Sequence, residues 1–477
     1  MARPTPPLPG GSVSISTRLQ EMQPTDIGVP GPTSLDMARG FRSIRADPLS
    51  FLSSVSEQYG DLVSFPVPGA PALLLNDPAA VRHVLQTSAR SWGKDTVQYA
   101  ALARVTGQGL LASAEPSWID HRRLAAPAFH HQRLEAVGDQ VRAAARSAVG
   151  VRLPAAVGAG GGTGVVDVAA LTHTIGLDAV GRALFSADLS GQAQTLLDAT
   201  SDAAELVVRL GRAILPRAHW TPTRLNVRLR SARRRLDAAS AEIIAQRRAR
   251  NGRASTAPHG DDLLGLLLDS GLTDAEVRDE LVTMIVAGHE TVAASLAWTF
   301  MLLAEHPEVQ DRTRAELAAH PGPVSLVATR EALPWTRAVI DEALRLFPPA
   351  WALSRRSVRD DVVAGHDVPA GTLAIISPWL VHRRPDPWTA PLAFRPERFL
   401  DPGAGRTAYL PFGQGPRLCI GREFALGEMV MVLDEVLREH RLDVPGDWSR
   451  PDPQARVAVH PRGGMPLLVT RLDRARA

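Results

Sequence analysis

Residues 412–421 of this 477-residue chain read Phe-Gly-Gln-Gly-Pro-Arg-Leu-Cys-Ile-Gly. A helical pattern follows at residues 424–437, so Cys419 stands on a glycine-rich loop that enters a helix. Backbone N–H groups and a helix N-terminus stabilise a thiolate in such a position. The glycines let the backbone approach the sulfur closely, and a soft thiolate suits iron. A lone cysteine can also be a small buried apolar residue or a nucleophile, but this setting favours an iron ligand.

The composition of the chain is that of a globular protein. Hydrophobic residues make up 45% and charged residues 22%, which indicates a sizeable core. Cys419 is the only cysteine, so no internal disulfide can form, as is typical of a reducing compartment. A net charge of +3 spread over this length argues against nucleic-acid binding, and the arginine-rich stretches 228–235 and 247–250 are expected to be solvated helix faces. Arginine dominates and Lys94 is the single lysine, which suggests a high-GC bacterial genome.

The N-terminal segment has no apolar core of a signal peptide, and no stretch holds 18 consecutive apolar residues. We therefore expect a cytoplasmic protein without a membrane anchor. Residues 1–28 are expected to form a flexible leader. Residues 29–477 should form one large domain, mainly α with a small β-rich portion.

Several elements can be placed from patterning alone. Helices are predicted at residues 47–59 and 77–86, and a hairpin between them at 61–65 and 72–75. The longest helix begins with a capping box of Thr273 and Glu276 and runs 34 residues to the position before Pro307. A helix of this length predicts the central element of a large domain. A further helix at 333–346 ends before Pro348.

Two loops are also predicted. The glycine run at residues 158–164 fits no phosphate-binding spacing, so we expect a flexible connection. A second loop is expected at residues 251–260.

The cysteine segment resembles the heme-binding signature of the cytochrome P-450 family, F-x-x-G-x-R-x-C-x-G, and matches it at every fixed position. The resemblance extends over roughly residues 29–470. It implies the family's mostly helical fold, heme b as the cofactor, and Cys419 as the axial ligand of the iron. Phe412 and Gly413 belong to the same cofactor-binding segment.

A second motif lies inside the long helix, where Ala287-Gly288-His289-Glu290-Thr291 resembles the family's oxygen-binding motif. The resemblance implies that Ala287 and Gly288 lie against the heme and its bound oxygen, that Thr291 holds dioxygen and a water, and that Glu290 relays protons. His289 is expected to point away as a non-ligand. On the residues alone, a Thr291 hydroxyl bonded to the preceding helical turn is an equally good account.

Glu342 and Arg345 match the family's E-x-x-R and share one helix face. Without the resemblance they would be an ordinary surface pair. The resemblance implies that they are buried, that they bond with Arg398 of the F-x-P-E-R-F match at residues 394–399, and that the trio braces the cysteine loop.

Trp118 and Arg122 match the family's W-x-x-x-R, which implies contact with the heme propionates. Arg355 and Arg417 occupy two further propionate positions by the same resemblance. His121 and Arg123, which flank Arg122, are left as candidates for surface contacts.

The resemblance implies a heme-thiolate monooxygenase that inserts one oxygen atom from dioxygen into a hydrophobic small molecule of secondary metabolism. Only 56 residues follow Gly421, so no reductase domain is expected and electrons should come from a ferredoxin and its reductase. An acidic ferredoxin would meet a basic surface near the cysteine loop, with Arg123 and Arg422 as candidates.

Two alternatives to this function stay open. One is a peroxide-driven heme enzyme, against which the Glu290–Thr291 pair argues, and the other is a heme-thiolate binding or sensor protein. The substrate pocket is expected at residues 92–111, 186–217, 349–353 and 456–458, with Trp351 close to the heme. Terpenoid, polyketide, fatty acyl and cyclic peptide substrates all fit this apolar lining.

Overall fold

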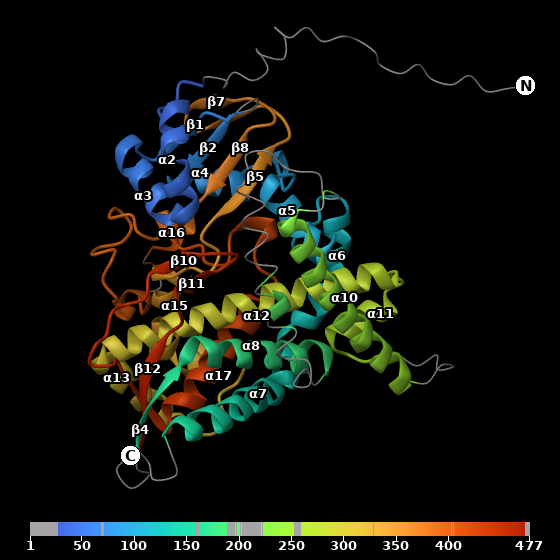
Figure 1. The fold of residues 1–477 in the computed structure, drawn as a ribbon, viewed down its shortest axis with the longest axis vertical. Coiled ribbons are helices and arrows are strands. Elements are labelled where there is room, and N and C mark those ends of the chain that lie inside the picture. The colour runs from blue at the N-terminus through green and yellow to red at the C-terminus, as the bar shows by residue number, and fades with distance from the viewer. Residues whose placement is uncertain are drawn as a thin grey trace, which may run out of the picture.

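The computed structural model describes residues 27–67, 71–157, 162–187, 196, 198–200, 202, 221, 223–251, 259–327, 329–401, 403 and 405–472. The predicted leader at 1–28 therefore lies almost entirely outside the described residues. Helices fill the larger part of the molecule, the largest sheet lies at one end, and a smaller sheet lies at the opposite end near the C-terminus (Figure 1). This arrangement confirms the predicted fold class, mainly α with a small β portion.

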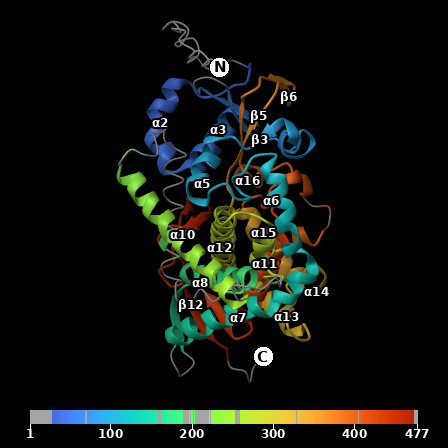
Figure 2. The same ribbon diagram turned by 90° about the vertical axis from the view of Figure 1, so that its right-hand side faces the viewer.

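The centre of the molecule is α12 (Asp274–Glu305), which is surrounded by other helices when seen end-on (Figure 2). It has 32 residues, two fewer than predicted, because Thr273 is the N-cap in extended conformation and His306 takes a non-helical conformation ahead of Pro307. The predicted capping box of Thr273 and Glu276 is present. By length and composition alone, α12 could cross a membrane. However, 83% of its 18-residue apolar stretch is buried inside the protein.

The largest sheet has the order β1-β2-β8-β5-β3 and combines both ends of the chain. The predicted hairpin is present as β1 (Leu62–Phe65) and β2 (Ala72–Leu75), paired antiparallel. β8 (Leu373–Ile376) lies parallel to β2, and β5 (Leu353–Ser357) lies between β8 and the short β3 (Trp92–Gly93). Strands from distant parts of the sequence thus join into one layer.

Helices α8 and α7 pack in succession below α12, with α17 beside them (Figure 1). The remaining helices flank this core or the sheet. Their bounds are α2 (Ser34–Ala46), α3 (Pro48–Tyr59), α4 (Pro78–Arg82), α5 (Val97–Thr106), α6 (Ser117–Ala125), α7 (His131–Val157), α8 (Val168–Phe185), α10 (Arg224–Asn251), α11 (Leu263–Asp269), α13 (Pro307–Ala319), α14 (Thr329–Ala332), α15 (Pro334–Leu346), α16 (Pro378–Val381) and α17 (Arg422–Leu437).

The other strands form three small sheets, in the orders β4-β12-β9, β10-β11 and β6-β7. Their bounds are β4 (Thr163–Asp167), β6 (Asp361–Val363), β7 (His366–Val368), β9 (His440–Asp443), β10 (Pro453–Ala455), β11 (Val459–Pro461) and β12 (Pro466–Arg471).

Two predictions of local structure are corrected. The helix predicted at 77–86 is α-helical only over Pro78–Arg82 and continues as a π-helical turn at His83–Thr87. The glycine run at 158–164 is not a loop throughout, because Thr163 and Gly164 begin β4 and pair with β12. Pairing with a strand about 300 residues away leaves no trace in local composition. Residues 158–161 and 252–258, and with them most of both predicted loops, lie outside the described residues.

A buried ion-pair network holds the segment that leads to the cysteine loop. Glu342 and Arg345 on α15 are both fully buried. Arg345 Nε and one terminal nitrogen donate to the Glu342 carboxylate at 2.7 and 2.9 Å. Its remaining N–H groups donate to carbonyl oxygens at distances of 2.7, 2.7 and 3.2 Å, namely those of His382, Pro391 and Ala393. Every donor of this guanidinium therefore has an acceptor.

Arg398 completes the predicted trio by donating from Nε to Glu342 Oε1 at 3.0 Å, and the backbone N–H of Arg395 donates to the same oxygen at 2.9 Å. The imidazole of His382 in turn accepts from the backbone N–H of Leu410 at 2.9 Å. The network thus holds His382, Arg395, Arg398 and Leu410, and Leu410 lies two residues before the cysteine loop.

We expect Glu342→Ala to leave the buried guanidinium of Arg345 and the half-buried guanidinium of Arg398 without their shared carboxylate. Losing one partner of a buried ion pair costs about 3–5 kcal/mol of the free energy of unfolding. Urea unfolding and the heme content of the purified protein measure the effect. Glu308→Ala, at an exposed position on α13, is the control and should behave as wild type. A Glu342→Ala protein with the wild-type unfolding midpoint would contradict the bracing role.

Candidate active site

A hydrogen bond closes the loop that carries Cys419. The backbone N–H of Cys419 donates to the carbonyl oxygen of Phe412 at 3.0 Å. Gly413 and Gly415 have φ values of +73° and +71°, which favour glycine. A Cβ on Gly415 would also lie 2.0 Å from the carbonyl oxygen of Leu85 in the π-helical turn. The loop therefore packs its backbone directly against that turn, and larger residues are excluded there.

The Cys419 side chain is accessible, although protein surrounds it closely enough for burial to raise the pKa of its thiol. A backbone hydrogen bond from Gly421 and the charges of Arg122 and Arg422 act in the opposite direction and lower that pKa. α17 begins at Arg422, so the positive end of its dipole lies near the sulfur. A metal ion bound to the sulfur would displace the thiol proton.

Cationic side chains gather beside this loop. Arg122, on α6, donates to the carbonyl oxygen of Leu418 at 2.8 Å. The Arg417 guanidinium lies 3.8 Å from the centre of the Trp118 ring and donates to Ser113 O at 2.9 Å. Trp118 and Arg122 therefore both contact the cysteine segment. Trp118 stacks on the guanidinium of Arg417, and Arg122 hydrogen-bonds to Leu418.

Arg355, on β5, is buried and donates to the Tyr99 hydroxyl at 3.3 Å. Lys94 is buried beside it, with Nζ 2.9 Å from the Leu111 carbonyl oxygen and 4.5 Å from the centre of the Tyr99 ring. Burial holds the pKa of Lys94 well below its usual value, and the charges of Arg355, Arg417 and Arg122 lower it further.

The cation cluster comprises Lys94, Arg122, Arg355 and Arg417. Among the residues that the structure describes, none of the four forms an ion pair with a carboxylate. Cations gathered without a counter-charge are costly, and a ligand with two carboxylates would neutralise them. Together with the neighbouring cysteine sulfur, this donor set fits a heme, whose two propionates meet the cations while its iron meets the thiolate.

Lys94 was not identified as a site residue by the sequence analysis. No motif contains it, and a lysine is normally an exposed residue. The one signal was that a chain rich in arginine keeps a single lysine.

α12 is buried at every position from Glu280 to Ala304 except Ala287, Gly288 and Thr291, which are half-buried. A Cβ on Gly288 would lie 3.0 Å from a methyl group of Val180 on α8, so this position also needs a small residue. The more accessible positions of the helix thus coincide with three of the predicted motif residues.

The Thr291 hydroxyl donates to the Ala287 carbonyl oxygen at 2.7 Å. Ser295 and Thr299 repeat this bond along the helix, each donating at 2.7 Å to the residue four before it. The hydrogen bond from the Thr291 hydroxyl to the preceding helical turn, which the residues alone allowed, is therefore present. The oxygen of the Thr291 hydroxyl keeps its capacity to accept a hydrogen bond.

Glu290 and His289 are both buried on α12. Burial raises the pKa of Glu290 to about 8, and the charge of Arg456 acts against this rise. His289 contacts α8, where its Nε2 lies 3.0 Å from Nδ1 of His173.

His121 was expected as a candidate for surface contacts, but it does not lie at the surface. It is buried on α6 and forms a short hydrogen-bonded ion pair with Glu280 of α12, because the helix places it opposite the exposed face that carries Arg123. Arg123 is exposed as expected and pairs with Asp120. α6 thus contacts the cysteine loop through Arg122 and the central helix through His121.

The site as built, a cysteine sulfur facing accessible space beside four cations, has the donor set of a heme-thiolate protein. The model of the cytochrome P450 family matches residues 31–468 of this chain. The cyclooctat-9-en-7-ol 5-monooxygenase of Streptomyces melanosporofaciens is 33% identical over 413 residues, covering 84% of this chain and 86% of that protein. The pentalenene oxygenase of Streptomyces avermitilis is 31% identical over 429 residues, covering 87% and 91%.

The fold is also similar to that of CYP175A1 from Thermus thermophilus, with a TM-score of 0.73, 29% identity, and coverage of 93% of this chain and 100% of that one. The chain belongs to the cytochrome P450 family. It is a P450 monooxygenase, and its cofactor is a heme iron.

The pKa of His121 is raised by its hydrogen bond to Glu280. A raised folded-state pKa adds stability that is complete below about pH 6.5 and is lost as the pH rises through the folded value. We expect the unfolding midpoint to fall over that pH window in the wild type and not in His121→Gln. His366→Gln, on β7, is the control and should keep the wild-type profile. Identical profiles for wild type and His121→Gln would show that the pair adds no stability.

Lys94→Met should weaken heme retention, because one cation of the cluster is lost while the length of the side chain is kept. A charge-assisted hydrogen bond contributes about 1.5 kcal/mol, so heme should transfer to apomyoglobin roughly tenfold faster. Arg90→Met, an exposed arginine outside the cluster, is the control. Equal transfer rates for all three proteins would exclude Lys94 from the heme site.

Proposed function

We propose that this P450 inserts one oxygen atom from dioxygen into a hydrophobic small molecule, with Cys419 as the axial ligand of heme b. The observation that carries the proposal is the closed Cys419 loop beside four cations that pair with no carboxylate among the described residues. Heme supplies the oxidising chemistry when bound, and the chain binds it, orients the substrate, excludes water and moves protons.

The residues divide into two sides of the site. Trp118, Arg122, Arg355 and Arg417 hold the propionates, and Lys94 adds a fifth donor. Phe412 and Gly413 shape the turn under the cysteine. On the other side, Ala287 and Gly288 leave room on α12 beside the heme.

Glu290 and Thr291 are the residues we assign to proton delivery. With a pKa of about 8, the Glu290 carboxyl is protonated at neutral pH and can release a proton when a stronger base demands it. Thr291 can accept a hydrogen bond from a water and, by exchanging its bond to Ala287 O, donate its own proton onward. This pair favours dioxygen chemistry over the peroxide-driven and sensor alternatives, which need no proton delivery.

For the substrate we propose a cyclic terpenoid of secondary metabolism. The supporting observation is that two relatives more than 30% identical are named for oxidation of cyclooctat-9-en-7-ol and of pentalenene. Trp351 is half-buried and donates from its indole to the Arg456 carbonyl oxygen at 2.8 Å, which joins two of the predicted pocket segments. Most of the predicted pocket segment 186–217 lies outside the described residues.

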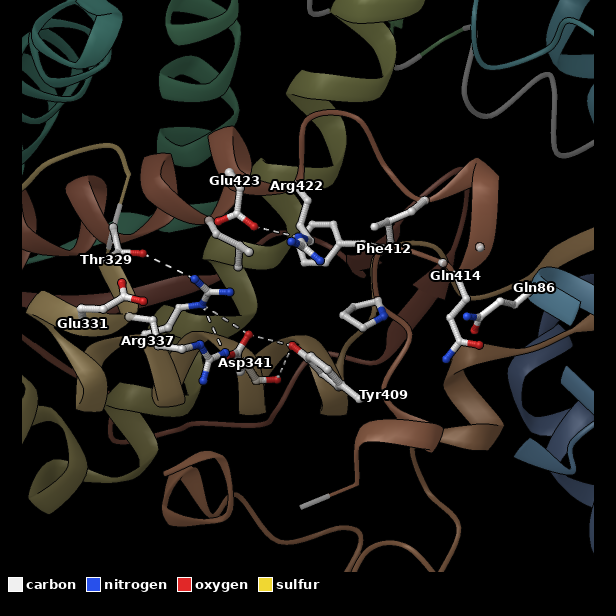
Figure 3. A pocket seen from close by; sticks show the side chains of 16 residues that line it. Gln86, Thr329, Glu331, Arg337, Asp341, Tyr409, Phe412, Gln414, Arg422 and Glu423 are labelled. Carbon is white, nitrogen blue, oxygen red and sulfur yellow. Dashed lines mark hydrogen bonds and ion pairs between the residues drawn. The ribbon is translucent and has the colours of Figure 1, made fainter. Parts of the chain in front are cut away.

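We propose a ferredoxin and its reductase as electron donors, acting in the cytoplasm. A hollow of about 970 Å³ lies directly beside the cysteine loop and is bordered by Phe412, Gln414 and Gln86 (Figure 3). Arg330, Arg337 and Arg422 line it, so an acidic partner could dock there. Acidic residues also line it, and Arg422 bonds to Glu423 at 2.8 Å, so the surface is mixed in charge.

The experiment that tests the function measures NADPH use, oxygen consumption and product with a surrogate ferredoxin system and a cyclic terpenoid chosen by its heme spin shift. Thr291→Ala should keep oxygen consumption and lose product per NADPH by roughly tenfold or more, with peroxide released instead. Thr299→Ala removes the same kind of back-bond two turns along α12 and should keep coupling. Wild type that consumes no oxygen with NADPH would overturn the monooxygenase function, and unchanged coupling in Thr291→Ala would overturn the role of Thr291.

A further inference from the structure

Three histidines from distant parts of the chain meet in the interior beside α12. His173 of α8 is the middle member, with Nδ1 3.0 Å from Nε2 of His289 on α12. Its ring stacks on that of His460 on β11, with centroids 5.3 Å apart and an interplanar angle of 19°. His289 and His460 are buried and His173 is half-buried, so the cluster runs from partly accessible protein to the core.

Burial favours the neutral form of all three imidazoles. Burial lowers the pKa of His173 to about 4 and that of His460 to about 3, and it holds the pKa of His289 well below the usual value. A neutral imidazole has one nitrogen that donates and one that accepts. It can therefore take a proton on one side and release one on the other, which a packing residue such as Phe could not do.

Arg456 connects this cluster with Glu290. It is half-buried in the turn between β10 and β11, and its charge acts on Glu290, His173 and His460. Within the described chain, Glu290 Oε2 and His289 Nδ1 are buried without a hydrogen-bond partner. A buried polar atom is costly when it is left dry, so we infer that water reaches each of these two atoms.

The other end of the cluster approaches the surface. Asp167, just before α8, is exposed, and its charge acts on His173. A carboxylate at the surface beside a partly accessible imidazole can exchange protons with solvent.

We propose that His173, His289 and His460, together with Arg456, form a proton path that reloads Glu290 from the surface beside Asp167. This proposal rests on the proposed function, since it assumes that Glu290 gives up protons. When Glu290 releases its proton toward Thr291, Arg456 stabilises the carboxylate. A proton then passes from the cluster to Glu290 through water, and the cluster takes one from solvent through His173. One proton is moved, and nothing is oxidised or reduced.

The test follows Glu290 itself and needs no turnover. The infrared band of its protonated carboxyl group is assigned in the heme-loaded protein by its loss in Glu290→Gln. After mixing with D2O, the rate at which this band shifts reports proton access to Glu290. We expect His173→Gln and His460→Gln, whose amides cannot relay protons, to slow the shift roughly tenfold or more. His440→Gln replaces a buried histidine on β9 whose Nδ1 lies 3.2 Å from the Val436 carbonyl oxygen, outside the cluster, and it should exchange like wild type.

Wild-type exchange in both His173→Gln and His460→Gln would overturn the path. If either variant fails to fold, Arg456→Gln provides the test, because losing the nearby cation should move the titration of the Glu290 band above pH 8. An unchanged titration would overturn the placement of Arg456. If the histidine variants exchange slowly but the wild type makes no oxygenated product, the path is upheld and the proposed function is rejected. If the wild type makes product and the variants exchange at the wild-type rate, the proposed function is upheld and the path is rejected.

Discussion

The carboxylate of Glu342 is shared by two guanidinium groups and one backbone N–H, in a place without water. Each of these donors would be costly if left alone, so the carboxylate decides where Arg395 and Arg398 can lie relative to α15. The cysteine loop starts two residues after Leu410 and is itself closed by a single backbone hydrogen bond. The position of the sulfur therefore depends on a charge network that contributes no atom to the chemistry.

The second organising constraint is also electrostatic, but it concerns cations that are not paired with carboxylates of the described protein. Glu342 pairs with its two arginines within the protein, whereas Lys94, Arg122, Arg355 and Arg417 form no ion pair with any carboxylate in the described part of the chain. The protein alone holds these groups at a cost, visible in the depressed pKa of Lys94, and binding a dianionic cofactor offsets it. Cofactor binding and folding stability are thus coupled through the same side chains.

What the sequence predicted correctly depends on spacing within single elements. The capping box of α12, the E-x-x-R pair and the glycines around Cys419 each express a local geometry that residue types dictate. What it missed depends on contacts between elements. Nothing near His121 signals Glu280, 159 residues away, and nothing near Gly164 signals its partner Val469 in β12. Lys94, His173 and His460 were missed for the same reason, because their environment comes from other parts of the chain, and the contact of His289 with His173 could not be foreseen either.

The five-stranded sheet has a consequence for how the protein is made. β2 pairs with β8, about 300 residues later, and β8 is the strand that joins the hairpin to β5. At synthesis rates of about 5–20 residues per second, the hairpin waits roughly 15–60 s on the ribosome with an unpaired edge. The loop with Cys419 emerges later still. Heme can therefore be held by the cysteine only after residue 419 has left the ribosome, and the unpaired strand edge is an aggregation hazard of the nascent chain until then.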